Sequence, residues 1–251
     1  MEQLIRYAEE YETEAFLTGD PSWFMHQVKG TDNQETMGFL ASTLSYGSRV
    51  QFMPKIEMLL KSSDGEPLEW LRSGAYKREF AKGDKRSFYR LYSYDLYASF
   101  LDCYSELTSE YGTLGNYVKS HAKTGLEAVE AICGFFATSS FGKTTVIPKD
   151  TTSACKRVCM FLRWMVRDNS PVDLGLWTFI DKKTLIMPLD THVLQQSVAL
   201  GLLSSKTASM SAAIRLSKRL GELFADDPLK GDFALFGYGV NNKNKNISTI
   251  R

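Results

Sequence analysis

The segment from Thr151 to Val193 constrains the fold of this chain more than any other part of its sequence. Between Ser153 and Arg167, apolar side chains recur at spacings of three, four and seven residues, which is the period of an amphipathic α-helix. Hydroxyl groups at its start can accept hydrogen bonds from the free amides of the first turn, and the candidates are Thr151, Thr152 and Ser153. The face opposite the apolar side chains presents one lysine and two arginines, which are Lys156, Arg163 and Arg167.

A second helix start follows in the sequence L-I-M-P-L-D-T-H-V. Asp190 is placed to cap a helix from residue 191 to residue 200, and Gly201 is placed to close it. A lysine near one helix start and an aspartate at another can form a nucleophile and carboxylate pair. Each residue also has an ordinary explanation, because a lysine on a helix face is usually solvated and an aspartate before Thr-His is usually only a cap.

Taken together, these residues resemble the helix-hairpin-helix DNA glycosylases of the endonuclease III superfamily. In that family a lysine in the second hairpin helix is followed by a loop and the motif V-D-T-H-V, whose aspartate is catalytic. Here L-D-T-H-V stands at Leu189 to Val193, so Asp190 matches the catalytic aspartate and Lys156 matches the lysine. The spacing between the two is longer than in endonuclease III and is similar to that of the archaeal 8-oxoguanine DNA glycosylases.

Over most of its length, the chain also resembles a widespread bacterial family of unassigned function. The shared patterns are C-K-R, L-R-W-M-V-R, D-L-G-L-W and P-L-D-T-H-V, and the resemblance runs from about Asp20 to Gly239. One departure from the glycosylases concerns the hairpin before the lysine, where P-K-D-T-T-S-A-C-K replaces the usual glycines. Those glycines let backbone amides approach a DNA phosphate closely, although free amides at the helix start can serve the same purpose.

The resemblance implies an all-α, two-lobed fold of the helix-hairpin-helix glycosylase type, with a cleft between the lobes. The central lobe would comprise residues 32–184 and end with the Lys156 helix, whereas residues 1–31 and 185–251 would form the second lobe and carry Asp190. The pattern of the residues also favours an all-helical protein, because strand signals are sparse throughout.

The function that the resemblance implies is base-excision repair by a bifunctional DNA glycosylase and AP lyase. A damaged base, which we expect to be an oxidised purine, would be flipped out of the duplex to expose the glycosidic carbon. Lys156 would attack that carbon and form a Schiff base, while Asp190 would stabilise the cationic sugar. The expected partner is double-stranded DNA with a damaged or abasic site.

Further candidates for DNA contact lie near the lysine and the aspartate. We expect Arg163, Arg167 and His192 to contact substrate or DNA. An extruded base needs an aromatic face and a hydrogen-bonding edge, so Trp164, Trp177 and Asp173 are candidates to line a base pocket. Tryptophans are more often core residues, and that alternative stays open.

Two more candidate DNA contacts lie earlier in the chain. The turn after the helix that ends near Tyr46 faces DNA in the glycosylases, so Tyr46, Ser48 and Arg49 are candidates by position. The segment from residue 75 to residue 94 interleaves basic residues, including Lys85 and Arg86, with aromatic ones, which suits phosphate contact plus stacking on bases. A simple helix end explains the first pattern equally well, and a solvated face over a buried aromatic stripe explains the second.

The composition limits what else the chain can be. Its formal net charge is +1, so a DNA-binding surface would have to be a local patch. The four cysteines form no recognisable disulfide framework, and the four-cysteine loop of endonuclease III is missing, so we expect no iron–sulfur cluster, metal or cofactor. The N-terminal segment contains acidic residues and does not resemble a secretion signal, and no apolar run could span a membrane. We therefore expect a cytoplasmic monomer.

Two other classes of function remain compatible with the sequence. A non-catalytic DNA-binding module could keep the fold without the chemistry, and its binding would depend strongly on salt. A helical interaction protein would agree with the small net charge and the missing hairpin glycines.

Overall fold

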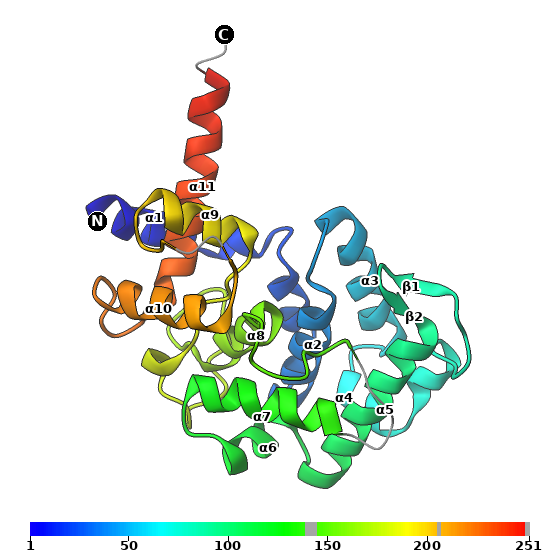
Figure 1. The fold of residues 1–251 in the computed structure, drawn as a ribbon. Helices are drawn as coiled ribbons and strands as arrows, with labels where there is room; N and C mark the ends of the chain where they lie inside the picture. Colours follow the sequence, from blue (N-terminus) through cyan, green and yellow to red (C-terminus); the bar gives the residue numbers. More distant parts are fainter. Residues whose placement is uncertain (139–144, 205–206, 249–251) are drawn as a thin grey trace. The chain divides into compact units, whose positions relative to one another are not determined.

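In a computed structural model of the chain, the structure describes residues 1–138, 145–204 and 207–248, with backbone only for residues 243–248. The described residues are mainly helical, which confirms the expected all-α class (Figure 1). The named strands in this part of the chain are β1 (Ser87–Tyr89) and β2 (Tyr92–Ser93), which pair as a short antiparallel hairpin. None of the helices described combines the length and the apolar character that crossing a lipid bilayer requires.

The chain divides into two compact units. Unit 1 comprises residues 1–18, 124–126 and 152–251, and unit 2 comprises residues 19–123 and 127–151. The central lobe expected over residues 32–184 therefore includes parts of both units. The helix that begins at Lys156 belongs to unit 1, and so does Asp190.

Unit 2 is a helical assembly around an aromatic core. Its elements are η2 (Pro21–Gln27), α2 (Thr31–Leu44), α3 (Arg49–Ser62), α4 (Pro67–Arg72), η3 (Ala75–Arg78), β1, β2, α5 (Tyr94–Tyr111), α6 (Leu114–His121) and most of α7 (Gly125–Thr138). Phe39 on α2 contacts Tyr104 and Phe100 on α5, with ring centroids 4.9 and 6.0 Å apart. Phe136 on α7 stacks on Phe100 at 5.4 Å. These buried rings explain why α2 is covered on nearly all sides.

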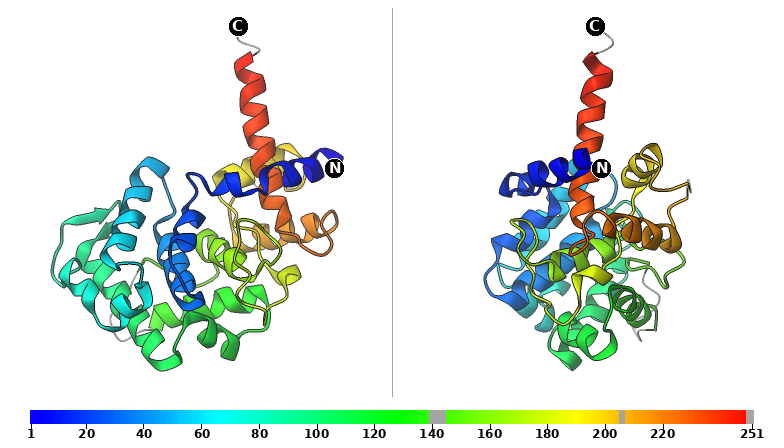
Figure 2. Two further views of the ribbon diagram at one scale, coloured as in Figure 1. Left: turned by 180° about the vertical axis from the view of Figure 1, so that it is seen from behind. Right: turned by 90° about the vertical axis from the view of Figure 1, so that its left-hand side faces the viewer.

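Unit 1 joins both ends of the chain. Its elements are α1 (Glu2–Tyr11), η1 (Glu14–Leu17), α8 (Lys156–Val166), η4 (Lys182–Thr184), α9 (Thr191–Ala199), α10 (Met210–Gly221) and α11 (Lys230–Ser248). The apolar face of α1 meets α11 in a cluster that contains Leu4, Ala8 and Ala234. Both views in Figure 2 show α1 lying against α11. The two helices approach closely because Gly237 has no side chain to meet the ring of Tyr11.

Candidate active site

The helix that carries Lys156 begins later than the sequence suggests. Residue 156 is the first residue of α8, and Cys155 occupies the N-cap with a φ of 45° and no capping side chain. Ser153 instead forms an isolated bridge with Ser209, so the backbone there pairs with a distant segment rather than starting the helix. The expected hydroxyl N-caps are therefore wrong. Lys156 therefore lies in the first turn of α8, where the free amides form the positive end of the helix.

Asp190 is the N-cap of α9, as the sequence predicts. Its Oδ1 accepts a hydrogen bond from the backbone amide of Val193 at 2.9 Å. The helix ends at Ala199, and Gly201 follows in the left-handed conformation with a φ of 69°. The side chain of Asp190 is half-buried, and so is that of Lys156.

A third residue, Asp232 in the first turn of α11, links the lysine and the aspartate. Its carboxylate accepts a hydrogen bond from Nη1 of Arg163 and interacts electrostatically with both Lys156 and Asp190. Burial, together with the charge of Asp190, raises the pKa of Asp232, while Arg163 and Lys156 oppose that rise. Lys156 and Asp190, 34 positions apart in the sequence, therefore both act electrostatically on one carboxyl group within unit 1.

Asp232 was not a candidate in the sequence. It stands in L-K-G-D-F-A-L-F-G, where an aspartate early in a helix looks like an ordinary partner for the helix dipole. No local pattern marks it, because its partner Arg163 lies 69 positions earlier in the chain.

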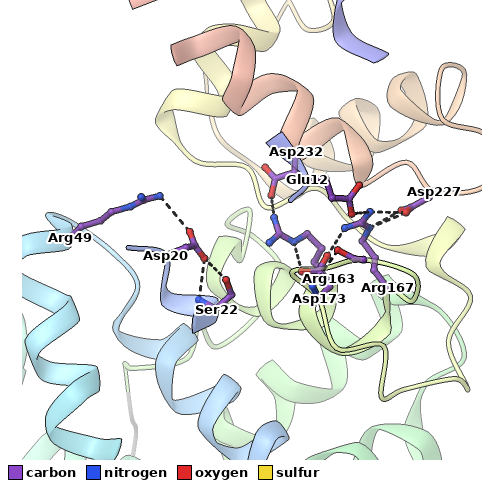
Figure 3. Close-up of polar contacts among 10 residues, drawn as sticks. Glu12, Asp20, Ser22, Arg49, Arg163, Arg167, Asp173, Asp227 and Asp232 are labelled. Atoms are coloured by element: carbon purple, nitrogen blue, oxygen red, sulfur yellow. Dashed lines mark hydrogen bonds and ion pairs between the residues drawn. The ribbon is translucent and has the colours of Figure 1, made fainter. Parts of the chain in front are cut away.

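Arg163 of α8 and Arg167, the residue that caps the C-terminus of this helix, lie in a buried ion-pair network and not on an exposed basic face (Figure 3). Arg163 Nε donates to Asp173 at 3.2 Å, and Arg167 also donates to Asp173. The guanidinium of Arg167 binds Asp227 through Nε at 2.9 Å and Glu12 through Nη2 at 2.7 Å. Side-chain exposure is only 4% for Arg163 and 0% for Arg167, so the expected DNA contacts by these two residues are wrong.

The network contains more negative than positive charge. Two guanidinium groups share four carboxylates, which belong to Glu12, Asp173, Asp227 and Asp232. Burial raises the pKa of Asp173, although both arginines favour its charged form. Burial also opposes the charge on Arg167, but the surrounding carboxylates outweigh it and raise the pKa of the guanidinium. The arginines are therefore neutralised internally, which makes the network structural.

The three residues expected to line a base pocket are also buried. Trp164 is 0% exposed, and Trp177 packs edge-on against Phe161 with ring centroids 5.4 Å apart. Asp173 belongs to the arginine network. The open alternative, that the tryptophans are core residues, is the one that the structure supports. His192 is different, since it is exposed in the first turn of α9.

In unit 2, the turn after α2 has both a buried and an exposed part. Tyr46 is half-buried, and Gly47 has a φ of 82°. Arg49, the first residue of α3, has a side chain 52% exposed and lies 3.4 Å from Asp20 (Figure 3). Arg49 is therefore accessible to a partner, as its candidate role requires.

The segment from residue 75 to residue 94 is a solvated face over a buried aromatic stripe. The stripe consists of Tyr76, Phe80, Phe88, Tyr89 and Tyr92, all at most 4% exposed. Lys85 and Arg86 are exposed, and each is paired locally, with Asp95 and Asp84 respectively. Stacking of bases on these aromatic rings is therefore wrong, because the rings fill the core of unit 2.

Two surface hollows lie away from Lys156 and Asp190. A hollow of about 350 Å³ beside Asn33 and Arg72 lies in unit 2, and one of about 370 Å³ beside Glu12 and Phe224 lies in unit 1. Neither is lined by Lys156 or Asp190. Within the described residues, no three His, Cys, Asp or Glu side chains are grouped to hold a metal ion.

The site thus consists of a lysine and two carboxylates at the starts of three helices in one compact unit, with Arg163 from the last turn of α8 bound to one of the carboxylates. This arrangement defines a helical protein with a polar site at helix N-termini. The chain belongs to the family described as Protein of unknown function (DUF2400), whose model matches residues 20–241. No curated protein and no solved structure matches the chain. The matched range includes Lys156, Asp190 and Asp232.

Proposed function

We propose that the protein is a base-excision DNA glycosylase with AP lyase activity, in which Lys156 is the nucleophile and Asp190 is the stabilising carboxylate. The substrate class is duplex DNA with a damaged base, an oxidised purine in the first place. The observation that carries the proposal is that Lys156, Asp190 and Asp232 stand at the starts of three helices of one compact unit, where the first two both act electrostatically on the carboxyl group of Asp232.

The proposed chemistry needs an amine nucleophile and a carboxylate. Neutral Nζ of Lys156 attacks C1′ of the sugar, the bond from C1′ to the base breaks, and the base leaves with the electron pair and takes up a proton. The attached amine then loses one proton, the bond from C1′ to O4′ breaks as O4′ takes the electron pair and a proton, and a protonated Schiff base remains. Positive charge develops on the sugar during this step, and a nearby carboxylate stabilises it. Asp190 uses Oδ1 for its cap, so its second oxygen is the one available for this role.

The start of α11 offers a place for the extruded base. Phe236 lies one turn after Asp232 and is 37% exposed, which is unusual for a large aromatic side chain. Its ring is held by edge contacts with Tyr11 and Phe16 at 5.6 and 5.1 Å. A flipped base is recognised by stacking on such a ring and by hydrogen bonds to its edge, which the carboxyl of Asp232 can form. These two residues replace the buried tryptophans as candidates for the base pocket.

Covalent trapping tests this proposal directly. Wild-type protein mixed with duplex DNA that contains 8-oxoguanine or an abasic site should form a covalent adduct when borohydride reduces the Schiff base. Lys156→Gln should lose the adduct entirely. Lys149→Gln is the matched control, since that lysine precedes the same helix, is 84% exposed and pairs only with Asp150 among the described residues.

Asp190→Asn separates chemistry from folding. The asparagine keeps an oxygen for the cap on Val193, so the fold should be retained. Release of the base should slow by about a hundredfold or more, as loss of one electrostatic stabiliser typically costs, while affinity for DNA stays close to that of the wild type. Absence of any adduct with the wild-type protein, or an adduct with Lys156→Gln, would refute the proposed chemistry.

A further inference from the structure

Two aliphatic side chains in unit 2 are far more exposed than a folded core requires. Val50, in the first turn of α3, is 84% exposed, and Leu91, at the tip of the β1–β2 hairpin, is 83% exposed. The other large hydrophobic side chains that are exposed in the described residues reach 66% at Met1 and 39% or less elsewhere. An apolar side chain held in water does not stabilise the fold, so these two side chains are open to a contact outside the chain.

The hairpin tip adopts a turn that its sequence does not favour. Arg90 and Leu91 form the two-residue connection between the paired residues Tyr89 and Tyr92. Arg90 has a φ of 49°, whereas such turns prefer glycine or asparagine at positions with positive φ. A residue in this conformation persists where the surrounding structure holds it, and such residues cluster at functional sites.

The tip is fastened to the turn between α2 and α3. The hydroxyl of Tyr89 donates to the backbone oxygen of Tyr46, and the guanidinium of Arg90 lies 5.5 Å from the centre of the Tyr46 ring. A Cβ on Gly47 would lie 2.6 Å from Nη1 of Arg90, so the close approach depends on that glycine. On the next turn of α3, Nζ of Lys55 lies 5.2 Å from the centre of the Phe88 ring. Figure 1 shows α3 beside the hairpin.

The exposed aliphatic side chains are flanked by positive charge. Arg49 precedes Val50, and Arg90 precedes Leu91. Asp20, which lies 3.4 Å from Arg49, is itself only 11% exposed, and in the described part of the chain Arg90 forms no ion pair with a carboxylate. The surface therefore combines two apolar tips with a net positive charge, which is complementary to the phosphates and base edges of DNA.

We propose that Arg49, Val50, Arg90 and Leu91 form a docking surface for duplex DNA, here called the hairpin surface. The arginines contact phosphates, and the aliphatic side chains contact base edges. This inference rests on the proposed function, because it specifies where DNA is bound. It adds a contact in unit 2 to the lysine chemistry in unit 1.

Binding to a duplex with a tetrahydrofuran abasic-site analogue tests the hairpin surface. The analogue has no aldehyde and cannot form a Schiff base, so affinity is measured without chemistry. Leu91→Ser and Val50→Ser should each weaken binding at least about fivefold, whereas Ile214→Ser, at a side chain 37% exposed in unit 1, should change it less than twofold. All three variants should melt within a few degrees of the wild type.

Arg90→Gly distinguishes a binding role from a structural one. Glycine suits a φ of 49°, so the melting temperature should be unchanged or higher, while affinity for DNA falls at least about fivefold. The slope of log affinity against log salt should decrease by about one. Lys61→Ala removes the same charge from the far end of α3, where Lys61 is 74% exposed and pairs with Glu57, and should leave both quantities nearly unchanged.

Three outcomes overturn the inference. The wild type fails to bind the duplex even at low salt, the hairpin variants bind as tightly as the wild type, or Arg90→Gly unfolds the protein. A wild type that binds through the hairpin surface but never traps on abasic DNA would refute the lysine chemistry and leave the hairpin surface intact. Hairpin variants that still trap on abasic DNA and bind it as tightly as the wild type would refute the hairpin surface and leave the lysine chemistry intact.

Discussion

At the scale of single residues, Arg167 illustrates how this protein keeps charge in its interior. The side chain is completely buried, and three carboxylates hold it: those of Glu12, Asp173 and Asp227. Desolvation makes such a group costly on its own, so its contribution depends on all its partners being present. Removal of the arginine would leave three buried acids without their shared cation.

Arg167→Met should therefore destabilise the protein strongly. We expect the free energy of unfolding to fall by about 3–5 kcal/mol, the range for breaking a buried ion pair from one side. Urea denaturation followed by circular dichroism measures this. Arg49→Met, at an ion pair whose arginine is 52% exposed, should change stability by less than about 1 kcal/mol. Equal losses for the two variants would contradict the role of burial.

Asp232 makes the stability of the folded protein depend on pH. Its pKa in the folded protein is raised above the ordinary value of 3.8, so the folded state keeps that proton to higher pH than the unfolded state does. The stabilisation linked to this proton is complete below about pH 3.8 and is lost as the pH rises through the folded pKa.

Asp232→Asn should remove this part of the pH dependence. Between pH 4 and pH 7, the stability of the wild type relative to that of the variant should decrease as the pH rises. The comparison between the two proteins is necessary because carboxylates with lowered pKa, such as Asp84 and Asp168, act in the opposite direction. Parallel curves in chemical denaturation at several pH values would show that Asp232 does not titrate in this range.

At the scale of elements, the contact between α1 and α11 sets the geometry of the candidate site. Ala234, which lies between Asp232 and Phe236 on α11, packs against α1, and Phe236 contacts Tyr11. A Cβ added to Gly237 would lie 2.5 Å from the ring of Tyr11 and 3.0 Å from Cβ of Tyr7. The glycine is required by this close approach and not by its backbone angles.

Gly237→Ala should destabilise the protein despite the better helix propensity of alanine. Overpacking typically costs about 1–3 kcal/mol, which exceeds the gain of about 1 kcal/mol from replacing a helical glycine. Gly134→Ala in α7 is the matched control, because no atom lies within 4 Å of its added Cβ. That control should be neutral or stabilising by up to about 1 kcal/mol in thermal or chemical denaturation. The same sign for both variants would argue against a close contact at Gly237.

At the scale of the whole molecule, the balance of charge restricts where DNA can bind. The chain has 30 basic and 29 acidic residues, and much of the basic charge is compensated locally or buried. The chain therefore has almost no excess of basic charge for a general DNA-binding surface, and the hairpin surface has to supply a local patch of positive charge. Unit 1 also uses α1, which precedes the range matched by the family model, so both ends of the chain contribute to its core.

The cysteines provide a test of the packing of both units. All four are free and buried, with Cys103 and Cys133 in unit 2 and Cys155 and Cys159 in unit 1. Burial raises the pKa of Cys159, which further suppresses its thiolate. We expect almost no reaction with a thiol reagent in the native protein at pH 8 and four reactive thiols after denaturation. Rapid reaction of one pair alone would show that its unit opens under native conditions.

The sequence by itself determined the helical class, the start of α9 at Asp190 and the candidate pair of Lys156 and Asp190. The helical class and the start of α9 depend on side chains a few positions apart, the range over which capping and helical periodicity act, whereas the candidate pair rests on the resemblance to the glycosylases. Only the tertiary structure decided that Arg163 and Arg167 are buried and that Asp232 joins the site. Three of the four partner carboxylates lie far along the chain, because Asp227 and Glu12 are 60 and 155 positions from Arg167 and Asp232 is 69 positions from Arg163. Desolvation and these contacts turn an apparently exposed basic face into a paired interior one.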